Sequence, residues 1–214
     1  DTWSLASASP ERFLHCAHGT LESRPIKGTR PRGATPALDE KIAADLLASG
    51  KDRAENTMIV DLLRNDMAKS CRDGSIEVPQ LCALEKFSNV HHLVSTIRGT
   101  LRADSSPLEA LRDCFPGGSI TGAPKIQAMG VIAELEPHAR GPYCGAMGYI
   151  GFDGQMDTNI LIRTAVIKGR DVYFHAGGGI VADSAADAEY NETLDKASGL
   201  IAALSDTPAG VRSA

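Results

Sequence analysis

The sequence has few aromatic residues, no long apolar run and no excess of basic charge. Phe, Trp and Tyr make up 5% of its 214 residues, and acidic and basic side chains are interspersed with a net charge of −5. It therefore lacks the basic, aromatic-rich surface that is typical of nucleic-acid-binding proteins. No apolar run approaches the roughly 18 residues that a membrane-spanning helix requires. We expect neither nucleic acid nor a membrane as a partner.

Paired cysteines and common nucleotide-binding motifs are also absent. The five cysteines are an odd number, widely spaced and without a CxxC pair, which indicates reduced thiols in a cytoplasmic protein and not a disulfide framework or a zinc site. The glycine-rich segments contain neither GxGxxG nor the GK[ST] ending of a phosphate-binding loop. An apolar content of 43% is ordinary for a folded chain of one large domain or two small ones.

The run RPIKGT at 24–29 places one lysine between a proline and a glycine in a cationic loop. Proline restricts the backbone and glycine permits a turn, so the Lys27 side chain can be aimed. An amine that attacks carbon must first lose a proton, and the nearby cations Arg24, Arg30 and Arg32 favour that loss. Lys27 is therefore a candidate nucleophile, although these six residues alone are more typical of a solvated basic loop.

Strand and helix patterns alternate along the chain. The final helix is expected to begin at the N-cap Ser184 and to end near Leu204, with the apolar stripe that starts at Tyr190 in the core. Residues 206–214 are expected to form a flexible tail. The other expected strands cover 2–7, 11–16, 20–26, 75–78, 84–89, 91–97, 143–152, 157–168 and 171–176. Two further helices are expected at 36–49 and 51–69, and a short one begins at 107. Another helix is expected to follow the glycine-rich loop at 115–125 and to end near 135.

Two acidic pairs lie on expected helices. Asp52 and Glu55 are three residues apart, as are Glu189 and Glu192, and Lys196 follows Glu192 by one further turn. If the two helices face each other, four carboxylates converge, and such a set suits a hard cation such as Mg²⁺. Either pair alone is more often ordinary surface charge.

Two further features are weak individually. The glycine run at 176–180 lies between a strand and a helix, so its backbone N–H groups could bind an anion such as a carboxylate. His92 is the second of two histidines on an apolar strand and could act in catalysis. A tight turn and a structural histidine are the commoner explanations.

Taken together, eight segments resemble one family along nearly the whole chain. They are SPERF (9–13), RPIKGT (24–29), KDRAENTMIVDLLRND (51–66), HHLVSTI (91–97), PGGSITGAPK (116–125), MDTNILIRT (156–164), AGGGIVADS (176–184) and AEYNETLDK (188–196). The sequence resembles the chorismate-utilising enzymes, and within them the aminodeoxychorismate synthases. The resemblance implies an α+β fold, a two-layered, mostly antiparallel sheet sandwich flanked by helices, of which 1–205 would be the carboxy-terminal part of the catalytic domain. An amino-terminal portion would be missing, and the chain is expected to associate with it or with itself.

Lys27 distinguishes the subfamilies in this resemblance. Anthranilate and isochorismate synthases generally carry a small residue there, whereas PIKGT is typical of aminodeoxychorismate synthases. The resemblance implies that Lys27 attacks C2 of chorismate as the 4-hydroxyl leaves, and that ammonia from a glutamine amidotransferase subunit then enters at C4. The product would be 4-amino-4-deoxychorismate, a precursor of 4-aminobenzoate and folate.

The resemblance also implies residue roles. Glu11 would be the acid near the departing hydroxyl, and His92 would assist in catalysis. Glu55 and Glu192 would bind Mg²⁺ directly, with Asp52 and Glu189 as outer ligands, although Asp52 departs from the glutamate common in the family. The residues expected to bind substrate are Thr29, Ser119, Tyr149, Arg163, Gly177, Gly178, Gly179 and Lys196, of which Arg163 and Tyr149 would hold a carboxylate.

Two alternatives stay open. One is another chorismate enzyme such as anthranilate synthase, which would aminate C2 and release pyruvate. The other is an inactive fragment that serves as a binding or assembly module. The identity of the product distinguishes the first alternative from an aminodeoxychorismate synthase, and covalent trapping of Lys27 would argue against the second.

Overall fold

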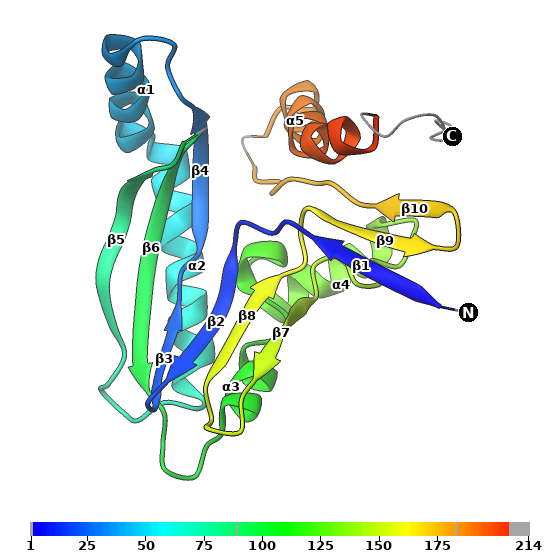
Figure 1. Ribbon diagram of the computed structural model, residues 1–214. Helices are drawn as coiled ribbons and strands as arrows, with labels where there is room; N and C mark the ends of the chain where they lie inside the picture. Colours follow the sequence, from blue (N-terminus) through cyan, green and yellow to red (C-terminus); the bar gives the residue numbers. More distant parts are fainter. Residues whose placement is uncertain (1, 89, 183, 206–214) are drawn as a thin grey trace. The chain divides into compact units, whose positions relative to one another are not determined.

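The computed structural model describes residues 2–88, 90–182 and 184–205 (Figure 1). The chain divides into two compact units. We call residues 11–137 and 146–160 the lysine unit, and residues 1–10, 138–145 and 161–214, as far as they are described, the glycine-loop unit. Both combine helices with antiparallel sheets, which confirms the expected α+β class. The expected tail at 206–214 lies outside the described residues.

The lysine unit contains a seven-stranded antiparallel sheet. Its strand order is β4-β6-β3-β2-β8-β7, and β5 pairs with β6. The strands are β2 (Arg12–Ala17), β3 (Thr20–Ser23), β4 (Ile26–Pro31), β5 (Glu77–Lys86), β6 (Val90–Thr100), β7 (Ala146–Ile150) and β8 (Met156–Ile160). Two strands were expected at 75–78 and 84–89, but β5 is a single strand whose pairing register shifts twice.

Strand β6 organises this sheet because three strands pair with it. β3 pairs with its carboxy-terminal half, from Thr20 opposite Thr100 to Ser23 opposite Ile97. β4 then continues along its amino-terminal half, and β5 pairs with both halves. Apolar β-branched residues suit such a central strand, and Ile97 is fully buried. The segment that carries Lys27 is therefore attached to the most buried strand of the unit.

Four helices and a short 3₁₀ turn complete the lysine unit. They are α1 (Pro36–Ala48), α2 (Gly50–Ala68), α3 (Pro107–Cys114), η1 (Gly118–Ile120) and α4 (Lys125–Leu135). Thr35 caps α1, with its hydroxyl accepting from Leu38 N at 3.3 Å, and Pro36 occupies the first turn. Ser49 ends α1 and caps α2, so the helix break expected at Gly50 occurs one residue earlier.

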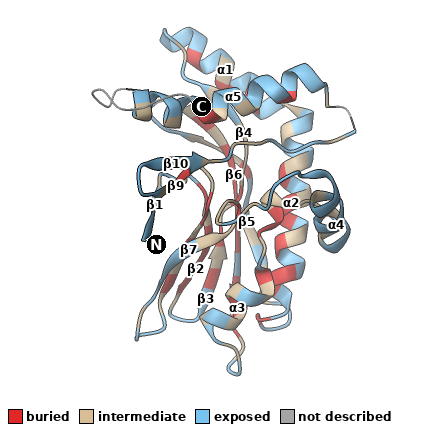
Figure 2. Cartoon of the chain, turned by 90° about the vertical axis from the view of Figure 1, so that its right-hand side faces the viewer, coloured by how far each residue is buried: buried red, intermediate tan, exposed pale blue. Residues whose placement is uncertain are grey.

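The long helix α2 packs against the sheet through one face. Ile59, Val60, Leu63 and Met67 on that face are buried, and Figure 2 shows buried residues along α2 and the inner strands. Met58 and Leu62 on the same helix are only half-buried. Burial of this apolar face drives the helix onto the sheet.

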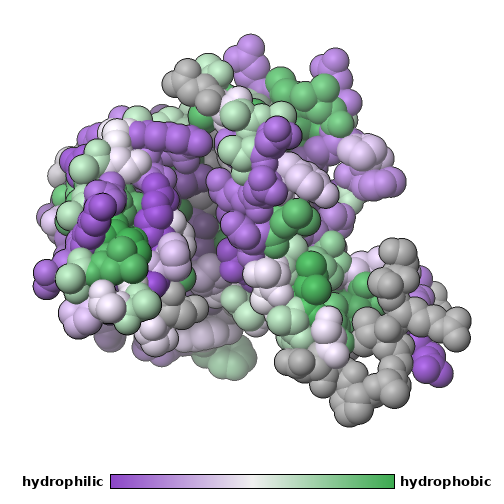
Figure 3. All heavy atoms as spheres, turned by 90° about the horizontal axis from the view of Figure 1, so that it is seen from above, coloured by the Kyte–Doolittle hydropathy of each residue, from purple (hydrophilic) through white to green (hydrophobic). Residues whose placement is uncertain are grey.

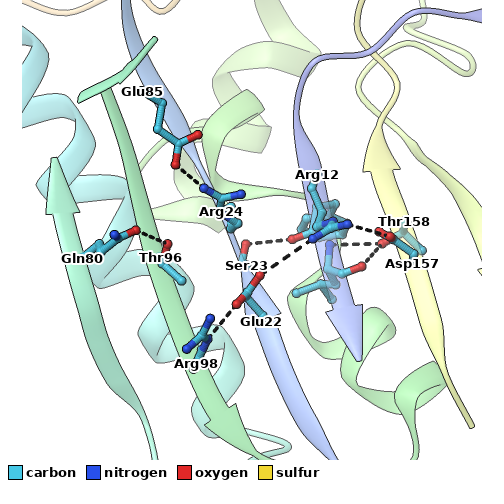
Figure 4. A network of polar contacts seen from close by, with 12 residues as sticks. Arg12, Glu22, Ser23, Arg24, Gln80, Glu85, Thr96, Arg98, Asp157 and Thr158 are labelled. Carbon is cyan, nitrogen blue, oxygen red and sulfur yellow. Dashed lines mark hydrogen bonds and ion pairs between the residues drawn. The ribbon is translucent and has the colours of Figure 1, made fainter. Parts of the chain in front are cut away.

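Polar side chains form a network along strands β2, β3, β6 and β8 (Figure 4). Arg12 donates to Asp157 at 2.9 Å and lies 3.8 Å from Glu22, which accepts from Arg98 at 2.7 Å. Glu22 and Arg98 are direct cross-strand partners. Opposite charges at paired positions stabilise the register of these strands.

The glycine-loop unit contains a three-stranded antiparallel sheet of order β1-β9-β10. Its elements are β1 (Trp3–Ser7), β9 (Thr164–Lys168), β10 (Asp171–Phe174) and α5 (Ala186–Ser205). A single strand was expected at 157–168, but β8 ends at Ile160 and β9 starts at Thr164 in the other sheet. The break coincides with Arg163, whose φ of 50° is incompatible with an extended strand.

Two expectations for α5 are wrong. The helix begins at Ala186, and the Ser184 hydroxyl donates to Glu189 Oε1 at 2.5 Å. The apolar stripe is largely exposed, because Tyr190 and Ile201 keep 64% and 48% of their surface accessible while only Ala197 of the stripe is buried. Helical periodicity identifies a shared face but not what covers that face.

Apolar side chains are exposed elsewhere as well. No residue of α4 is buried, and Ile126 and Leu135 are 81% and 73% exposed. Viewed from above, hydrophobic residues form separate green patches between polar side chains (Figure 3). Within the described ranges, no helix has the length and apolarity needed to cross a membrane. Association through such patches with a missing portion or a second copy stays a prediction.

Candidate active site

Lys27 lies in strand β4, and not in a loop, next to an irregularity in the pairing of β4 with β6. Ile26 pairs with Val94 and Thr29 with His92, so two residues of β4 stand opposite one of β6. Gly28 takes a φ of 85° here, which glycine adopts without strain. A Cβ on Gly28 would lie 3.0 Å from both Asp52 and Leu46. The bulge therefore lets β4 pass close to α1 and α2 while it redirects Lys27.

The ammonium of Lys27 contacts the glycine-rich loop that follows α3. Lys27 Nζ donates to the backbone carbonyl of Ser119 at 3.3 Å. Gly117 and Gly118 let the loop pack closely against its neighbours, because a Cβ added at these positions would come within 2.7 Å of Ile160 and Leu62, respectively. Ser119 is one of the residues expected to bind substrate, and its contact with Lys27 uses the backbone carbonyl.

The three arginines near Lys27 are each paired with a carboxylate. Arg24 donates to Glu85, Arg30 to Asp52 at 2.9 Å, and Arg32 to Asp39. The positive charge of each arginine is therefore partly compensated by a neighbouring carboxylate. Their sequence positions indicated positive charge but could not reveal acids contributed by α1, α2 and β5.

The two adjacent histidines have different surroundings. His92 is half-buried, and its Nδ1 lies 2.8 Å from the hydroxyl of Thr29, its direct partner on β4. His91 is fully buried, with Nε2 2.8 Å from Asp39 Oδ1. Both histidines pair with residues of β4, but only His92 keeps part of its surface accessible.

Asp39 anchors the start of α1 to the sheet through several contacts. Its carboxylate accepts from Arg32 through both oxygens at 2.8 Å, from the Gly33 backbone and from His91. The Arg32 guanidinium, followed by the Gly33 N–H group, holds the pKa of Asp39 well below its ordinary value. This ion pair fixes the end of β4 beyond the bulge.

Glu11, the expected acid, is buried in the lysine unit, with 7% of its surface exposed. It immediately precedes β2, and its carbonyl accepts from Ile160 N at 3.1 Å, which ties it to β8. A buried carboxyl group is a chemically suitable proton donor because desolvation disfavours its charged form.

The first expected acidic pair lies on α2. Asp52 and Glu55 are both half-buried in the first turns of the helix. Asp52 Oδ2 accepts from Arg30, whereas Glu55 forms no ion pair within the described part of the chain. The ion pair compensates the Asp52 charge and makes it less suited than Glu55 to direct metal binding.

The second pair lies beside the glycine run in the glycine-loop unit. A Cβ on Gly178 would be 3.3 Å from Glu189 Oε2, 3.7 Å from Glu192 Oε1 and 3.8 Å from Lys196 Nζ. Lys196 pairs with Glu192 at 2.5 Å. The structure thus brings four predicted site residues together: Gly178 lies beside Glu189, Glu192 and Lys196. Ser184, which sequence reasoning treated only as a cap, also contacts this group through Glu189.

The two residues expected to hold a carboxylate belong to different units. Arg163 lies between β8 and β9 with the positive φ described above, a strained geometry of the kind found at functional positions. Tyr149 is on the edge strand β7 and is 65% exposed. Tyr143 was missed: its hydroxyl lies 3.0 Å from where a Cβ on Gly177 would be, and its ring stacks near His175. No sequence signal marks it.

The carboxylates suit a hard cation by their chemistry, but they are divided between the units. Glu189 and Glu192 each bring a carboxylate oxygen close to Gly178, and oxygen donors of this kind suit a hard cation. Among the described residues, no group of three or more His, Cys, Asp or Glu side chains is placed to hold a metal ion. One of the two expected acidic pairs lies in each unit.

Comparison with known proteins defines the class. Residues 1–202 match the family described as chorismate binding enzyme. The chain therefore belongs to the chorismate binding enzymes, as its motifs predicted. The fold agrees: anthranilate synthase component I from Streptococcus pneumoniae superposes with a TM-score of 0.84 at 39% identity, covering 92% of this chain and 43% of that one. The menaquinone-specific isochorismate synthase MenF from Escherichia coli gives 0.83 at 26% identity, covering 93% and 45%.

Within this class, two kinds of curated relative are similarly close. Aminodeoxychorismate synthase component 1 of Escherichia coli is 51% identical over 94% of this chain and 44% of its own length. Anthranilate synthase component 1 of Geobacillus stearothermophilus is 49% identical over 95% and 40%. The chain thus spans about two-fifths of the length of these relatives. Overall identity separates the two kinds poorly, so individual residues must decide between them.

Proposed function

We propose that this chain is the chorismate-binding part of an aminodeoxychorismate synthase component 1, with Lys27 as the covalent nucleophile. The observation that carries the proposal is the placement of Lys27 on a bulged strand, with its ammonium held at the Ser119 carbonyl. A lysine in a strand interior needs a specific reason to be redirected, and covalent catalysis provides one.

In the first proposed step, the neutral Lys27 amine bonds to C2 of chorismate. Both ring double bonds shift, from C1=C2 to C1=C6 and from C5=C6 to C4=C5, as the C4–O bond breaks and the hydroxyl leaves as water with a proton from Glu11. The buried position of Glu11 supports this role. The proton lost by the Lys27 nitrogen balances the one that the leaving group takes up.

In the second step, ammonia bonds to C4, the double bonds return to their first arrangement, and the C2–N bond to Lys27 breaks. The entering nitrogen loses one proton and Lys27 regains one, so the net change is replacement of the 4-hydroxyl by an amino group. The Thr29–His92 pair on β4 and β6 would relay a proton, and the 2.8 Å separation of Thr29 Oγ1 and His92 Nδ1 supports this role. A glutamine amidotransferase subunit would supply the ammonia, in keeping with the name component 1 of the relatives.

Substrate carboxylates would be bound by cationic and backbone groups. Arg163 offers a guanidinium suited to two parallel hydrogen bonds, and the backbone of Gly177, Gly178 and Gly179 offers N–H donors. Lys196, beside Gly178, adds positive charge, and Tyr149 adds a hydroxyl. These residues, with Ser119 and Thr29, would orient the ring toward Lys27.

Mg²⁺ would be held by Glu55 and Glu192, with Asp52 and Glu189 as outer ligands. When bound, the ion would neutralise and orient a substrate carboxylate. The closeness of Glu189, Glu192 and Lys196 to Gly178 supports this assignment, and the ion pair with Arg30 favours an outer role for Asp52. A cytoplasmic location and a role in 4-aminobenzoate supply are part of the same proposal.

Lys27→Ala is the decisive test. The chain is incubated with chorismate and Mg²⁺ without ammonia, alone and after joining to the amino-terminal portion of an aminodeoxychorismate synthase relative, and intact mass is measured. Wild type should gain the mass of chorismate less one water, and ammonia should release 4-amino-4-deoxychorismate. Lys27→Ala should show no adduct, with a stability change within about ±0.5 kcal/mol.

Matched controls define the contradicting outcomes. Lys41→Ala, on the exposed side of α1, should form the adduct normally. Release of pyruvate and formation of anthranilate would instead establish the C2-aminating alternative, which the 49% identity to an anthranilate synthase keeps open. Absence of an adduct in both the chain and the joined protein would leave a binding module.

A further inference from the structure

A second lysine, Lys125, forms a buried network behind the loop that contacts Lys27. It is the first residue of α4, and its side chain is only 11% exposed. Its ammonium donates to Asp66, to the carbonyl of Cys114 at 2.8 Å and to the carbonyl of Pro116 at 2.7 Å. An ammonium has three N–H donors, and here all three have acceptors.

The carboxylate partner is even more buried. The side chain of Asp66, near the end of α2, is 2% exposed and also accepts from Lys69 Nζ at 3.0 Å. Removal of one partner from a buried ion pair leaves an uncompensated charge, so such pairs hold their elements firmly together. Lys125 therefore joins the end of α2 to both sides of the α3 end, at Cys114 and Pro116.

The network restrains the segment that presents the acceptor for Lys27. Pro116 and Lys125 flank Gly117–Pro124, and Lys125 bonds to the carbonyl that begins this segment. Inside this segment, the Thr121 hydroxyl donates to the Gly117 carbonyl at 3.0 Å. Gly117 packs against side chains of the sheet, and Gly118 packs against α2. Ser119, at the centre, accepts from Lys27 Nζ.

We infer that Lys125 is a positioning residue for Lys27: it closes the loop 116–125 so that the Ser119 carbonyl is held where it meets the Lys27 ammonium. It contacts no residue assigned above to chorismate or metal binding, and it acts through the loop backbone. The inference rests on the proposed role of Lys27 for its catalytic consequence. The structural part, a Lys27 side chain held through Lys125, can be tested without any catalysis.

The test compares this chain with Lys125→Met and with a matched control, Lys69→Met. Lys69 also bonds to Asp66, but its side chain is 52% exposed and it has no contact with the loop 116–125. Each protein is treated with limiting acetic anhydride, and acetylation of each lysine is followed by peptide mass spectrometry, with Lys41 as internal reference. Melting temperatures are measured in parallel.

In Lys125→Met, acetylation of Lys27 relative to Lys41 should rise by about 2- to 10-fold, the factor that corresponds to the net contribution of one hydrogen bond. Lys69→Met should leave it unchanged. Equal Lys27 acetylation in wild type and a folded Lys125→Met protein would overturn the inference, as would an equal rise in Lys69→Met. If Lys125→Met does not fold, Asp66→Asn replaces it, because the amide keeps the shape of the side chain and removes its charge. Unchanged acetylation of Lys27 in that variant would again overturn the inference.

A second measurement separates positioning from general loss of structure. In the joined protein, Lys125→Met should slow chorismate adduct formation by about 10- to 100-fold, the scale expected for a displaced reacting group, while the final adduct per mole stays the same. A lower final amount at an unchanged rate would indicate misfolded molecules and contradict positioning. If wild type forms no adduct, the proposed function fails, whereas the acetylation result still decides whether Lys125 positions Lys27.

Discussion

The lysine unit and the glycine-loop unit present their candidate functional groups in different ways. In the lysine unit, Lys27 is aimed by a strand bulge between β6 and two helices, and most of the buried apolar residues of the described chain belong to this unit. In the glycine-loop unit, the acidic pair is on α5, of which Ala197 is the buried apolar residue. A covalent nucleophile requires a defined direction of attack, whereas carboxylates that attract a cation tolerate more freedom.

The largest expected effect concerns the core. Leu93→Ala in β6, at a fully buried position, should lower the free energy of unfolding by about 2–5 kcal/mol through lost burial and a cavity. Ile201→Ala in α5 removes a side chain that is 48% exposed, so the free energy of unfolding should change by no more than about 0.5 kcal/mol. Urea unfolding followed by circular dichroism measures both. Similar losses would show that α5 is as firmly packed as the sheet.

An intermediate effect is expected for Gly28→Ala. Alanine would be strained at a φ of 85° and would crowd Asp52 and Leu46, so we expect a loss of about 1–3 kcal/mol and loss of chorismate adduct on Lys27. Gly169→Ala is the matched control in the other unit, because its φ is 63° and its added Cβ meets nothing within 4 Å. Urea unfolding and intact mass measure the two effects.

The control isolates strain from crowding. Gly169→Ala should cost about 1 kcal/mol or less and leave adduct formation intact. If the two variants lose equal stability and both form the adduct, the close approach of β4 to α2 has no role in directing Lys27.

The smallest expected effect is a pH dependence centred on Asp39. Its pKa is lowered in the folded protein, chiefly by Arg32, so the folded state binds the proton less readily than the unfolded state. The stability that Asp39 contributes is therefore present above its unfolded pKa of about 4 and is lost as the pH falls further. Asp39→Asn should be less stable at neutral pH and should lose less stability on acidification than wild type.

Urea midpoints between about pH 7 and pH 2.5 test this dependence, since that range spans the ordinary carboxyl pKa. Asp61→Asn serves as the control, because the Asp61 side chain is 65% exposed. An acid-induced loss of stability that is identical in wild type and Asp39→Asn would contradict the assignment.

Sequence patterns predicted much of the fold, and they failed at particular residues. The helix starts at Pro36 and Pro107 and the strand at 3–7 were predicted because caps, prolines and alternation are local signals. The division of 157–168 into two strands was missed, because no local pattern marks the positive φ of Arg163 or the assignment of β8 and β9 to different sheets. The exposed stripe of α5 was missed because periodicity carries no information about the covering surface.

The sequence by itself determined the family, the candidate nucleophile and the residue types of the site, because motifs such as RPIKGT and AEYNETLDK carry chemistry in their order. Only the tertiary structure decided that Arg30 compensates Asp52, that Ser119 offers its carbonyl to Lys27, and that Lys125 is bound to Asp66. Each of these pairs joins residues far apart in the chain. Such contacts depend on how helices and strands pack, and packing is a property of the whole fold and not of a local pattern.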